Sequence, residues 1–276
     1  MTPHVVCIGL ATQDTVVGVP RWPVGDDRVV ASAVAVAGGG PAATAAVALA
    51  RLGIRAFFVG QVGDDAVGAA IREGLQSEGV DTTCVANVDG ASPRSVVLVS
   101  GDRRAIAAYP GTLPPLVLDD ASRQLCRDAA WVHVDHLGYA AAPENVRLSV
   151  DGGNPIEGLD LAGVALYAPT EAGLRDAFGG PQGALAAGAA LVVVTRGASG
   201  SIAYTSDGAV VDAPGRVAEV VSTLGAGDVF HGALLAALVW ERPLNEALAF
   251  ANECAALSCR ALDGRSAIPR LEEVAP

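Results

Sequence analysis

The sequence predicts an α/β fold: a three-layer αβα sandwich with a mostly parallel central sheet and a small antiparallel β lid. Short β-branched runs alternate with helical segments along the chain, which is typical of a sheet covered by helices on both faces. Two hairpin patterns interrupt that alternation and do not suit a parallel sheet. The chain has 276 residues, 51% of them hydrophobic, so we expect one large core and a single domain over 1–276.

The amino-terminal third begins the alternation. Pro41 and Gly53 mark the start and end of one helix, and Asp64 and Gly79 those of another, because proline and aspartate favour helix starts whereas glycine favours ends. The elements expected here are strands at 4–10, 28–36 and 55–60, and helices at 41–52 and 64–78.

Two segments are assigned to the lid. Residues 94–109 read "RSVVLVS-GD-RRAIAAY", and glycine at the first turn position is typical of a type II′ hairpin. Together with residues 16–36 they are expected to form a few antiparallel strands outside the main sheet. An exposed sheet face of valine and alanine is a liability for a monomer, so we predict a homodimer that forms through this lid.

The carboxyl-terminal part continues the alternation. Only nine residues, 137–145, separate two expected strands, so the crossover there has room for at most a two-turn helix. The elements expected here are strands at 131–135, 146–150, 163–168, 190–195 and 218–222, a hairpin at 200–213, and helices at 228–240 and 243–260.

Composition excludes several classes of function. The net charge is −12, which is unsuited to binding a nucleic-acid backbone, and all eighteen basic residues are arginine. Without lysine the chain has neither a Schiff-base lysine nor a Walker-type phosphate loop. The uncharged stretch 29–50 contains "GGGP" and is interpreted as strand, turn and helix, so no membrane span is expected. Five scattered cysteines and a start without a basic n-region predict a reduced, cytoplasmic protein.

The strongest chemical motif is "EVVSTLGAGDVFHGALLAAL" at 219–238. Gly225, Ala226 and Gly227 form a tight turn before a helix that is expected to begin at Asp228. Free amides at a helix start, aided by the helix dipole, bind anions without lysine. A carboxylate beside a phosphate site has a purpose if it removes a proton from the hydroxyl that attacks the phosphate. The alternative is that Asp228 only caps the helix.

This motif resembles the second signature of the ribokinase-like (pfkB) carbohydrate kinase family, D-T-x-G-A-G-D. "GGPAATAAVALARLG" resembles the first signature, and "VGQVGDDAVGAAIREGLQSEGVD", "VVVTRGASGS" and "FANECAALSCRALDGRSAIP" are similar to other family segments. The resemblance covers nearly the whole chain in the family's order. It implies the ribokinase-like fold and ATP- and Mg²⁺-dependent phosphoryl transfer to a sugar hydroxyl.

The resemblance also implies roles for individual residues. Asp228 matches the catalytic base and Gly225, Ala226 and Gly227 match the anion hole for the transferring phosphoryl group. Glu171 matches the glutamate that is linked to Mg²⁺ through water, with a first-turn helix glutamate as the alternative. The implied acceptor-binding residues are Asp14, Gly39, Gly40 and Thr44, and the implied nucleotide-binding residues are Thr195, Gly197 and Asn252.

Three positions depart from the family pattern. Thr44 replaces an asparagine that contacts the acceptor, and Ala168 replaces the asparagine of N-x-x-E. Ser222 replaces an aspartate associated with a monovalent cation, so the resemblance does not support dependence on potassium. Within the family, the motifs "GGGPAATAAVALARLG" and "GAGDVFHGAL" are similar to those of bacterial sulfofructose kinases. Arg28 fits that comparison, but Ala108 and Leu137 stand where polar sulfonate contacts are expected, so sulfofructose is kept as an alternative acceptor.

Other polar residues have more than one interpretation. In "HVDH" at 133–136, His133 and Asp135 share one strand face and His136 takes the other, which argues against a metal site made of these three. His136 or Asp135 could touch the substrate at a strand end. His231 either lines the acceptor pocket or packs beneath its helix. Arg103 and Arg104 are expected to form a solvated lid edge.

Three functions follow from these observations. The first is an ATP-dependent sugar kinase with Asp228 as base. The second is a catalytically silent sugar or nucleotide sensor, which would not need that base. The third is a nucleoside kinase, which would need an aromatic platform, and the chain has only twelve aromatic residues. The pattern does not identify the acceptor sugar.

Overall fold

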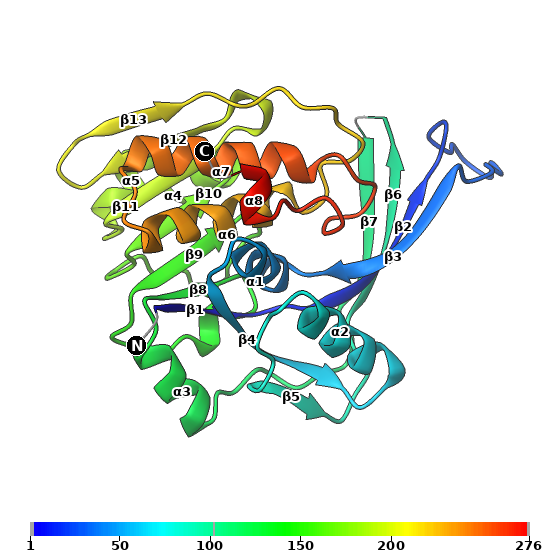
Figure 1. Ribbon diagram of the computed structural model, residues 1–276, viewed down its shortest axis with the longest axis horizontal. Coiled ribbons are helices and arrows are strands. Elements are labelled where there is room, and N and C mark those ends of the chain that lie inside the picture. Colours follow the sequence, from blue (N-terminus) through cyan, green and yellow to red (C-terminus); the bar gives the residue numbers. More distant parts are fainter. Residues whose placement is uncertain (1–2, 102, 275–276) are drawn as a thin grey trace.

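The computed structural model describes residues 3–101 and 103–274. Within this part of the chain the main sheet has nine strands in the order β13-β12-β11-β10-β9-β8-β1-β4-β5 (Figure 1). Its pairs are parallel from β5 to β11, and β12 and β13 add an antiparallel hairpin at one edge. The strands are β1 (His4–Ile8), β4 (Arg55–Gly63), β5 (Val85–Val88), β8 (Trp131–Val134), β9 (Leu148–Gly152), β10 (Leu166–Pro169), β11 (Leu191–Thr195), β12 (Ser201–Thr205) and β13 (Val210–Ala213).

Helices cover both faces of this sheet, as predicted. Alternate residues of β1 point into two separate cores: Val5 and Cys7 into one, Val6 and Ile8 into the other. The first core is closed by α1 (Pro41–Arg51), α2 (Ala66–Ser77), α6 (Ala226–Val239), α7 (Leu244–Ser258) and α8 (Leu271–Val274). The second core is closed by α3 (Asp120–Arg127), α4 (Glu171–Phe178) and α5 (Pro181–Ala186).

A four-stranded lid sheet stands beside the main sheet, to the right in Figure 1. Its order is β3-β2-β6-β7, with β2 (Thr12–Gly18), β3 (Ala33–Gly39), β6 (Arg94–Ser100) and β7 (Arg103–Tyr109). The pairs β2–β3 and β6–β7 are antiparallel, whereas β2 and β6 join the two hairpins in parallel. The predicted hairpin at 94–109 is confirmed, and Gly101 at its turn has φ +58°.

The other segment, expected at 16–36, does form antiparallel lid strands, but with different bounds. Its strands run from Thr12 to Gly18 and from Ala33 to Gly39, and the ladder between them opens at the Gly18–Ala33 pair. The expected strand at 28–36 therefore begins five residues late. Pro20 follows β2 directly, and a proline has no amide hydrogen with which to continue the ladder.

Several other boundaries differ from the expected ones because tertiary contacts set them. The strands expected at 146–150 and 163–168 lie two to three residues later, because β8, β9 and β10 pair with one another in parallel register. The strand expected at 218–222 is wrong: the sheet ends at β13, and the amides of Val221 and Ser222 donate to the Cys259 carbonyl instead. Asp65, not Asp64, caps α2 by accepting the Gly68 amide.

Two predictions about connections are confirmed. Residues 29–50 contain all of β3, a glycine turn and most of α1. Among the described residues there is no helix long and apolar enough to cross a membrane. The short crossover at 137–145 holds only one 3₁₀ turn, η1 (Tyr139–Ala141). A further 3₁₀ turn, η2 (Gly197–Ser199), follows β11.

Candidate active site

A cleft of about 500 Å³ lies between the lid and the carboxyl ends of the parallel strands. Its walls come from β2, β3, β6 and β7 on the lid side, and from the ends of β8 to β11 and the start of α6 on the sheet side. The cleft brings together eight of the predicted site residues from distant parts of the chain: Asp14, Gly39, Gly40, Thr44, Thr195, Gly225, Gly227 and Asp228.

Four predicted residues do not line this cleft. Ala226 is the first residue of α6, and Gly197 opens η2. Glu171 is exposed at the first position of α4, next to Thr170, which does line the cleft. The side-chain amide of Asn252 donates to the carbonyls of Ala213 and Pro214 at 3.0 and 3.3 Å, so it ties α7 to the end of β13.

The glycine turn before α6 has two glycines with different tasks. Gly225 is the N-cap residue, with φ +75°, and a Cβ there would lie 2.8 Å from the Gly264 carbonyl oxygen. Gly225 is therefore required by the fold itself. A Cβ on Gly227 would meet open space on the cleft side. The backbone at Gly227 is thus accessible from the cleft, and a side chain there would occupy part of that space.

Asp228 is the third residue of α6, not its first as predicted, and α6 begins without a side-chain cap. The reading of Asp228 as a helix cap is therefore wrong. Burial raises the pKa of Asp228 well above its usual range, and the charges of Asp151 and Asp135 raise it further, against the opposing charges of Arg265 and Arg104. A carboxyl group in this environment is a better proton acceptor than a solvated one.

Asp14 is the centre of a second polar group in the cleft wall. Its Oδ1 accepts hydrogen bonds from the hydroxyls of Thr12 and Ser95 at 2.7 and 2.8 Å. Its Oδ2 lies only 2.0 Å from where a Cβ of Gly39 would be, so the diglycine is what lets this carboxylate approach the backbone. Gly40, with φ +89°, turns the chain into α1. These contacts hold one carboxylate oxygen and leave the other beside the cleft.

Arg265 is a site residue that the sequence did not reveal. It is 7% exposed, and its guanidinium donates to Thr44 Oγ1 at 3.2 Å and to the Gly39 carbonyl at 2.7 Å. Burial lowers the pKa of Arg265 to about 10, against the opposing charges of Asp14 and Asp228, so it stays charged at neutral pH. The residue that replaces the family's asparagine, Thr44, is thus held by a buried cation. Arg265 lies in the segment 250–269 that resembles the family, but the pattern did not single it out, because its partners lie some 220 residues away.

The polar residues of "HVDH" and His231 lie at or beneath the cleft. His136 and His231 line the cleft, whereas Asp135 is buried and accepts backbone amides of Leu10, Ala42, Leu137 and Gly138. Asp135 thus fixes the junction of β1, α1 and the loop after β8.

The prediction of a solvated edge is confirmed for Arg104, which is exposed on the edge strand β7, but its side chain also has a place in the cleft. Its side chain reaches Thr223 and lines the cleft, because β7 pairs with β6 at the lid's cleft side. Arg103 instead packs over Trp22, with its guanidinium carbon 4.5 Å from the ring centroid. Alternation along one strand separates the two neighbours. Asp151, at the end of β9, also lines the cleft and was missed, because its strand was placed two residues too early.

Comparison with known families identifies this arrangement. The family profile of pfkB family carbohydrate kinases matches residues 2–149 and 159–271, which is nearly the whole chain. The chain belongs to the pfkB family of carbohydrate kinases. The resemblance noted in the sequence is thereby confirmed, and the chain is an ATP-dependent carbohydrate kinase.

Individual relatives of this pfkB kinase are similar over their full length. It is 27% identical to the ribokinase of Bacillus subtilis over 98% of both chains. It is 29% identical to the ATP-dependent ribose-1-phosphate kinase of Halopiger xanaduensis over 99% of this chain and 97% of the other. The structure of Arabidopsis thaliana ribokinase complexed with ribose and ATP superposes with a TM-score of 0.83, at 25% identity over 99% and 98% of the two chains.

Proposed function

We propose that this pfkB kinase transfers the γ-phosphoryl group of ATP to a hydroxyl of a sugar, with Asp228 as the general base. The observation that carries the proposal is the position of Asp228: it lies in the cleft one residue after Gly227, whose backbone is open to a ligand, and it has a raised pKa. The acceptor oxygen attacks the γ-phosphorus as the bond to the β-phosphate oxygen breaks. The proton of the hydroxyl passes to Asp228, and ADP leaves.

The acceptor is proposed to lie between Asp14 and Asp228. Asp14 Oδ2 accepts a sugar hydroxyl, and the diglycine at 39–40 lets the sugar approach the backbone. Arg265 holds the floor of this subsite through Thr44 and Gly39. Because the lid strands β2, β3, β6 and β7 form the far wall, a bound sugar is shielded from water that would otherwise hydrolyse ATP.

The nucleotide is proposed to lie along the other end of the cleft. Thr195, at the end of β11, lines it, and Gly197 follows in η2. Glu171 is an exposed carboxylate beside the cleft residue Thr170. Mg²⁺ prefers oxygen ligands and often binds carboxylates through water, so Glu171 is suited to this ion. When bound, Mg²⁺ neutralises charge on the phosphates. The amides at the start of α6 orient the transferring group.

An anionic acceptor is the second candidate. Arg94 and Arg104 both line the cleft from the lid, which would favour a phosphorylated or sulfonated sugar over a neutral one. Arg28 is exposed and Ala108 and Leu137 give the cleft apolar contacts, so sulfofructose has less support than the arginines alone suggest.

The assay that tests both candidates measures ADP release with Mg²⁺·ATP and a panel of pentoses, hexoses, their phosphates, sulfofructose and nucleosides. A neutral sugar with the highest kcat/KM supports the first candidate. A phosphosugar or sulfosugar whose KM rises in Arg94→Gln and Arg104→Gln supports the second. Binding of ATP and sugar without turnover of any compound would favour the silent sensor instead.

We also propose a cytoplasmic homodimer. Val34, Val36 and Val96 are 52–64% exposed on the lid face that points away from the cleft, where a second copy would cover them. The five cysteines among the described residues are free thiols, which fits a reducing compartment. Light scattering at micromolar concentration checks the dimer, and Val36→Glu should convert it to a monomer.

A further inference from the structure

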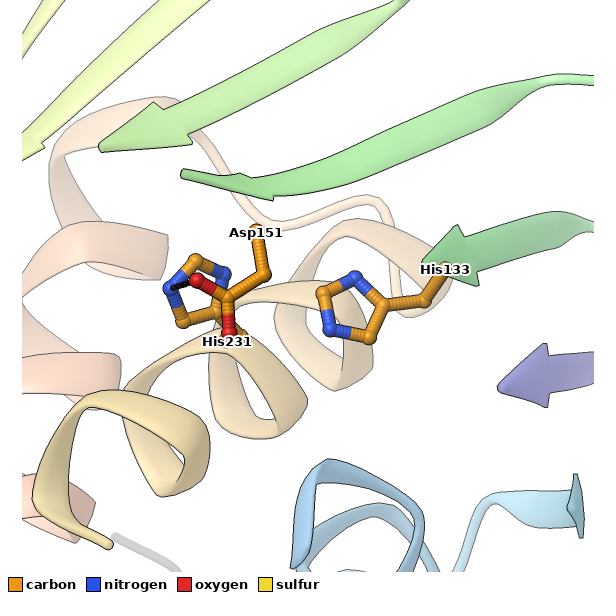
Figure 2. Close-up of side chains that lie close together, drawn as sticks. All are labelled: His133, Asp151 and His231. Carbon is orange, nitrogen blue, oxygen red and sulfur yellow. Dashed lines mark ion pairs between the residues drawn. The ribbon is translucent and has the colours of Figure 1, made fainter. Parts of the chain in front are cut away.

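Three buried side chains converge beneath the cleft: His133 from β8, Asp151 from β9 and His231 from α6 (Figure 2). One ligand atom of each lies within 4.8 Å of those of the other two. The three residues are 0%, 4% and 4% exposed. Apart from the effect of the Asp151 charge on the pKa of Asp228, none of them has a place in the phosphoryl transfer proposed above. Polar groups buried in this way require an explanation, because leaving them without partners is costly.

The hydrogen bonds of the two imidazoles are incomplete. His133 Nδ1 lies 3.1 Å from Ser149 Oγ, and His231 Nε2 lies 3.5 Å from Asp151 Oδ1. His133 Nε2 and His231 Nδ1 are buried and have no partner among the described residues. When His133 donates from Nδ1 to Ser149, its Nε2 presents a lone pair toward the cluster.

The charges around the cluster favour a cation. The Asp151 carboxylate is buried, and within the described residues His231 is its only ion-pair partner. Burial raises the pKa of both Tyr167 and Asp228, and the charge of Asp151 raises each of them further. A buried carboxylate is stable only when it is well compensated. Two imidazoles and one carboxylate are also a donor set that transition-metal ions take, whereas Mg²⁺ prefers oxygen alone.

We propose that His133, Asp151 and His231 bind one divalent transition-metal ion, with Zn²⁺ as its representative. Ser149 accepts the Nδ1 hydrogen of His133 and so orients the ring. Metal-bound histidines almost always donate their second ring N–H to a neighbouring group in this way. Asp151 and His231 line the cleft, so the ion has a path of entry, and a water or substrate oxygen can complete its coordination.

The geometry requires only a small contraction. Ligand atoms about 2.1 Å from a tetrahedral zinc lie about 3.4 Å apart, and the His231–Asp151 pair at 3.5 Å already meets this. The widest separation, at most 4.8 Å, must close by rotation of the side chains. Figure 2 shows the Asp151 carboxylate against the His231 ring, with the ion pair dashed, and the His133 ring facing them from the end of β8.

The test is metal binding by the full chain in the absence of nucleotide and sugar, so its outcome does not depend on kinase activity. Protein dialysed against a chelator is titrated with Co²⁺ while the visible spectrum is recorded, and Zn²⁺ is then added in competition. We expect one Co²⁺ per chain with the visible bands of a low-coordinate site, displacement by Zn²⁺, and a Tm that rises when Zn²⁺ is added.

Variants locate the ion. His231→Asn and Asp151→Asn remove a ligand and should abolish the bands, while Ser149→Ala should weaken binding about 10–100-fold. His4→Asn and His136→Asn, which change the other two histidines of the chain, should retain the site, and so should Glu171→Gln. Circular dichroism confirms that each variant is folded. Wild-type protein without saturable 1:1 binding, or His231→Asn with unchanged binding, overturns the proposal.

Discussion

Replacement of Asp228 by asparagine separates catalysis from structure in this site. Asparagine has nearly the same shape as aspartate but cannot accept the proton of an attacking hydroxyl. A positioned general base contributes about 10²–10⁴-fold to the rate, which corresponds to about 3–5 kcal/mol of transition-state stabilisation. We therefore expect kcat of Asp228→Asn to fall by that factor, while binding of ATP and of the sugar persists.

The structure predicts little change in folding stability for the same variant. The Asp228 side chain is not the cap of α6, so no capping bond is lost. Loss of a negative charge in the first helical turn costs about 0.3–1 kcal/mol. Relief of burial and of repulsion from Asp151 and Asp135, the causes of the raised pKa, offsets this loss. Because the folded-state pKa lies above the unfolded value, the carboxylate costs stability at neutral pH and not at low pH.

Three measurements test this reasoning together: steady-state kinetics by coupled ADP release, nucleotide binding by calorimetry, and urea unfolding at pH 7. Asp120→Asn is the matched control, since Asp120 is also an aspartate in the first turn of a helix, but is exposed on α3. It should retain full activity. If Asp228→Asn turns over the best acceptor at nearly the wild-type rate, Asp228 is not the base.

Four further outcomes are expected. Gly227→Val should reduce kcat and ATP affinity with little loss of stability, because its Cβ enters open cleft space, whereas Gly225→Val should unfold more easily, since its φ is +75°. The acid limb of the kcat/KM profile should lie above pH 4, because the raised pKa of Asp228 makes this base lose its charge at a higher pH than an ordinary aspartate. Arg265→Met should move that limb to still higher pH and, by leaving the Gly39 carbonyl without its donor, cost about 1–3 kcal/mol in urea unfolding. Activity in sodium-only and potassium buffers should be comparable, because the Ser222 hydroxyl accepts the Leu224 amide and offers no anionic oxygen; a large, specific potassium activation would contradict this.

Strand boundaries show where a linear pattern is insufficient. Hydrophobic runs identified β9 and β10, but each strand begins where its neighbour offers a hydrogen-bonding partner, and β8 sets that register. The expected strand ended at residue 150, whereas β9 extends to Gly152 and includes Asp151, which lines the cleft. The run at 218–222 has the composition of a strand, yet no strand of the described sheet pairs with it.

The local chemistry of this kinase was determined by the sequence itself. The turn Gly225–Gly227 is adjacent to Asp228 in the chain, and the glycines at 39–40 directly precede their helix. Both features depend on short-range backbone geometry, so they could be predicted from the sequence without knowledge of the fold. Which charged side chains are buried, and which residues they contact, is decided only by the tertiary structure. Arg265 meets Thr44, and His133 meets Asp151 and His231, because strands and helices far apart in sequence pack against one another. Burial and the energy of a charge depend on that packing, and a one-dimensional pattern does not contain it.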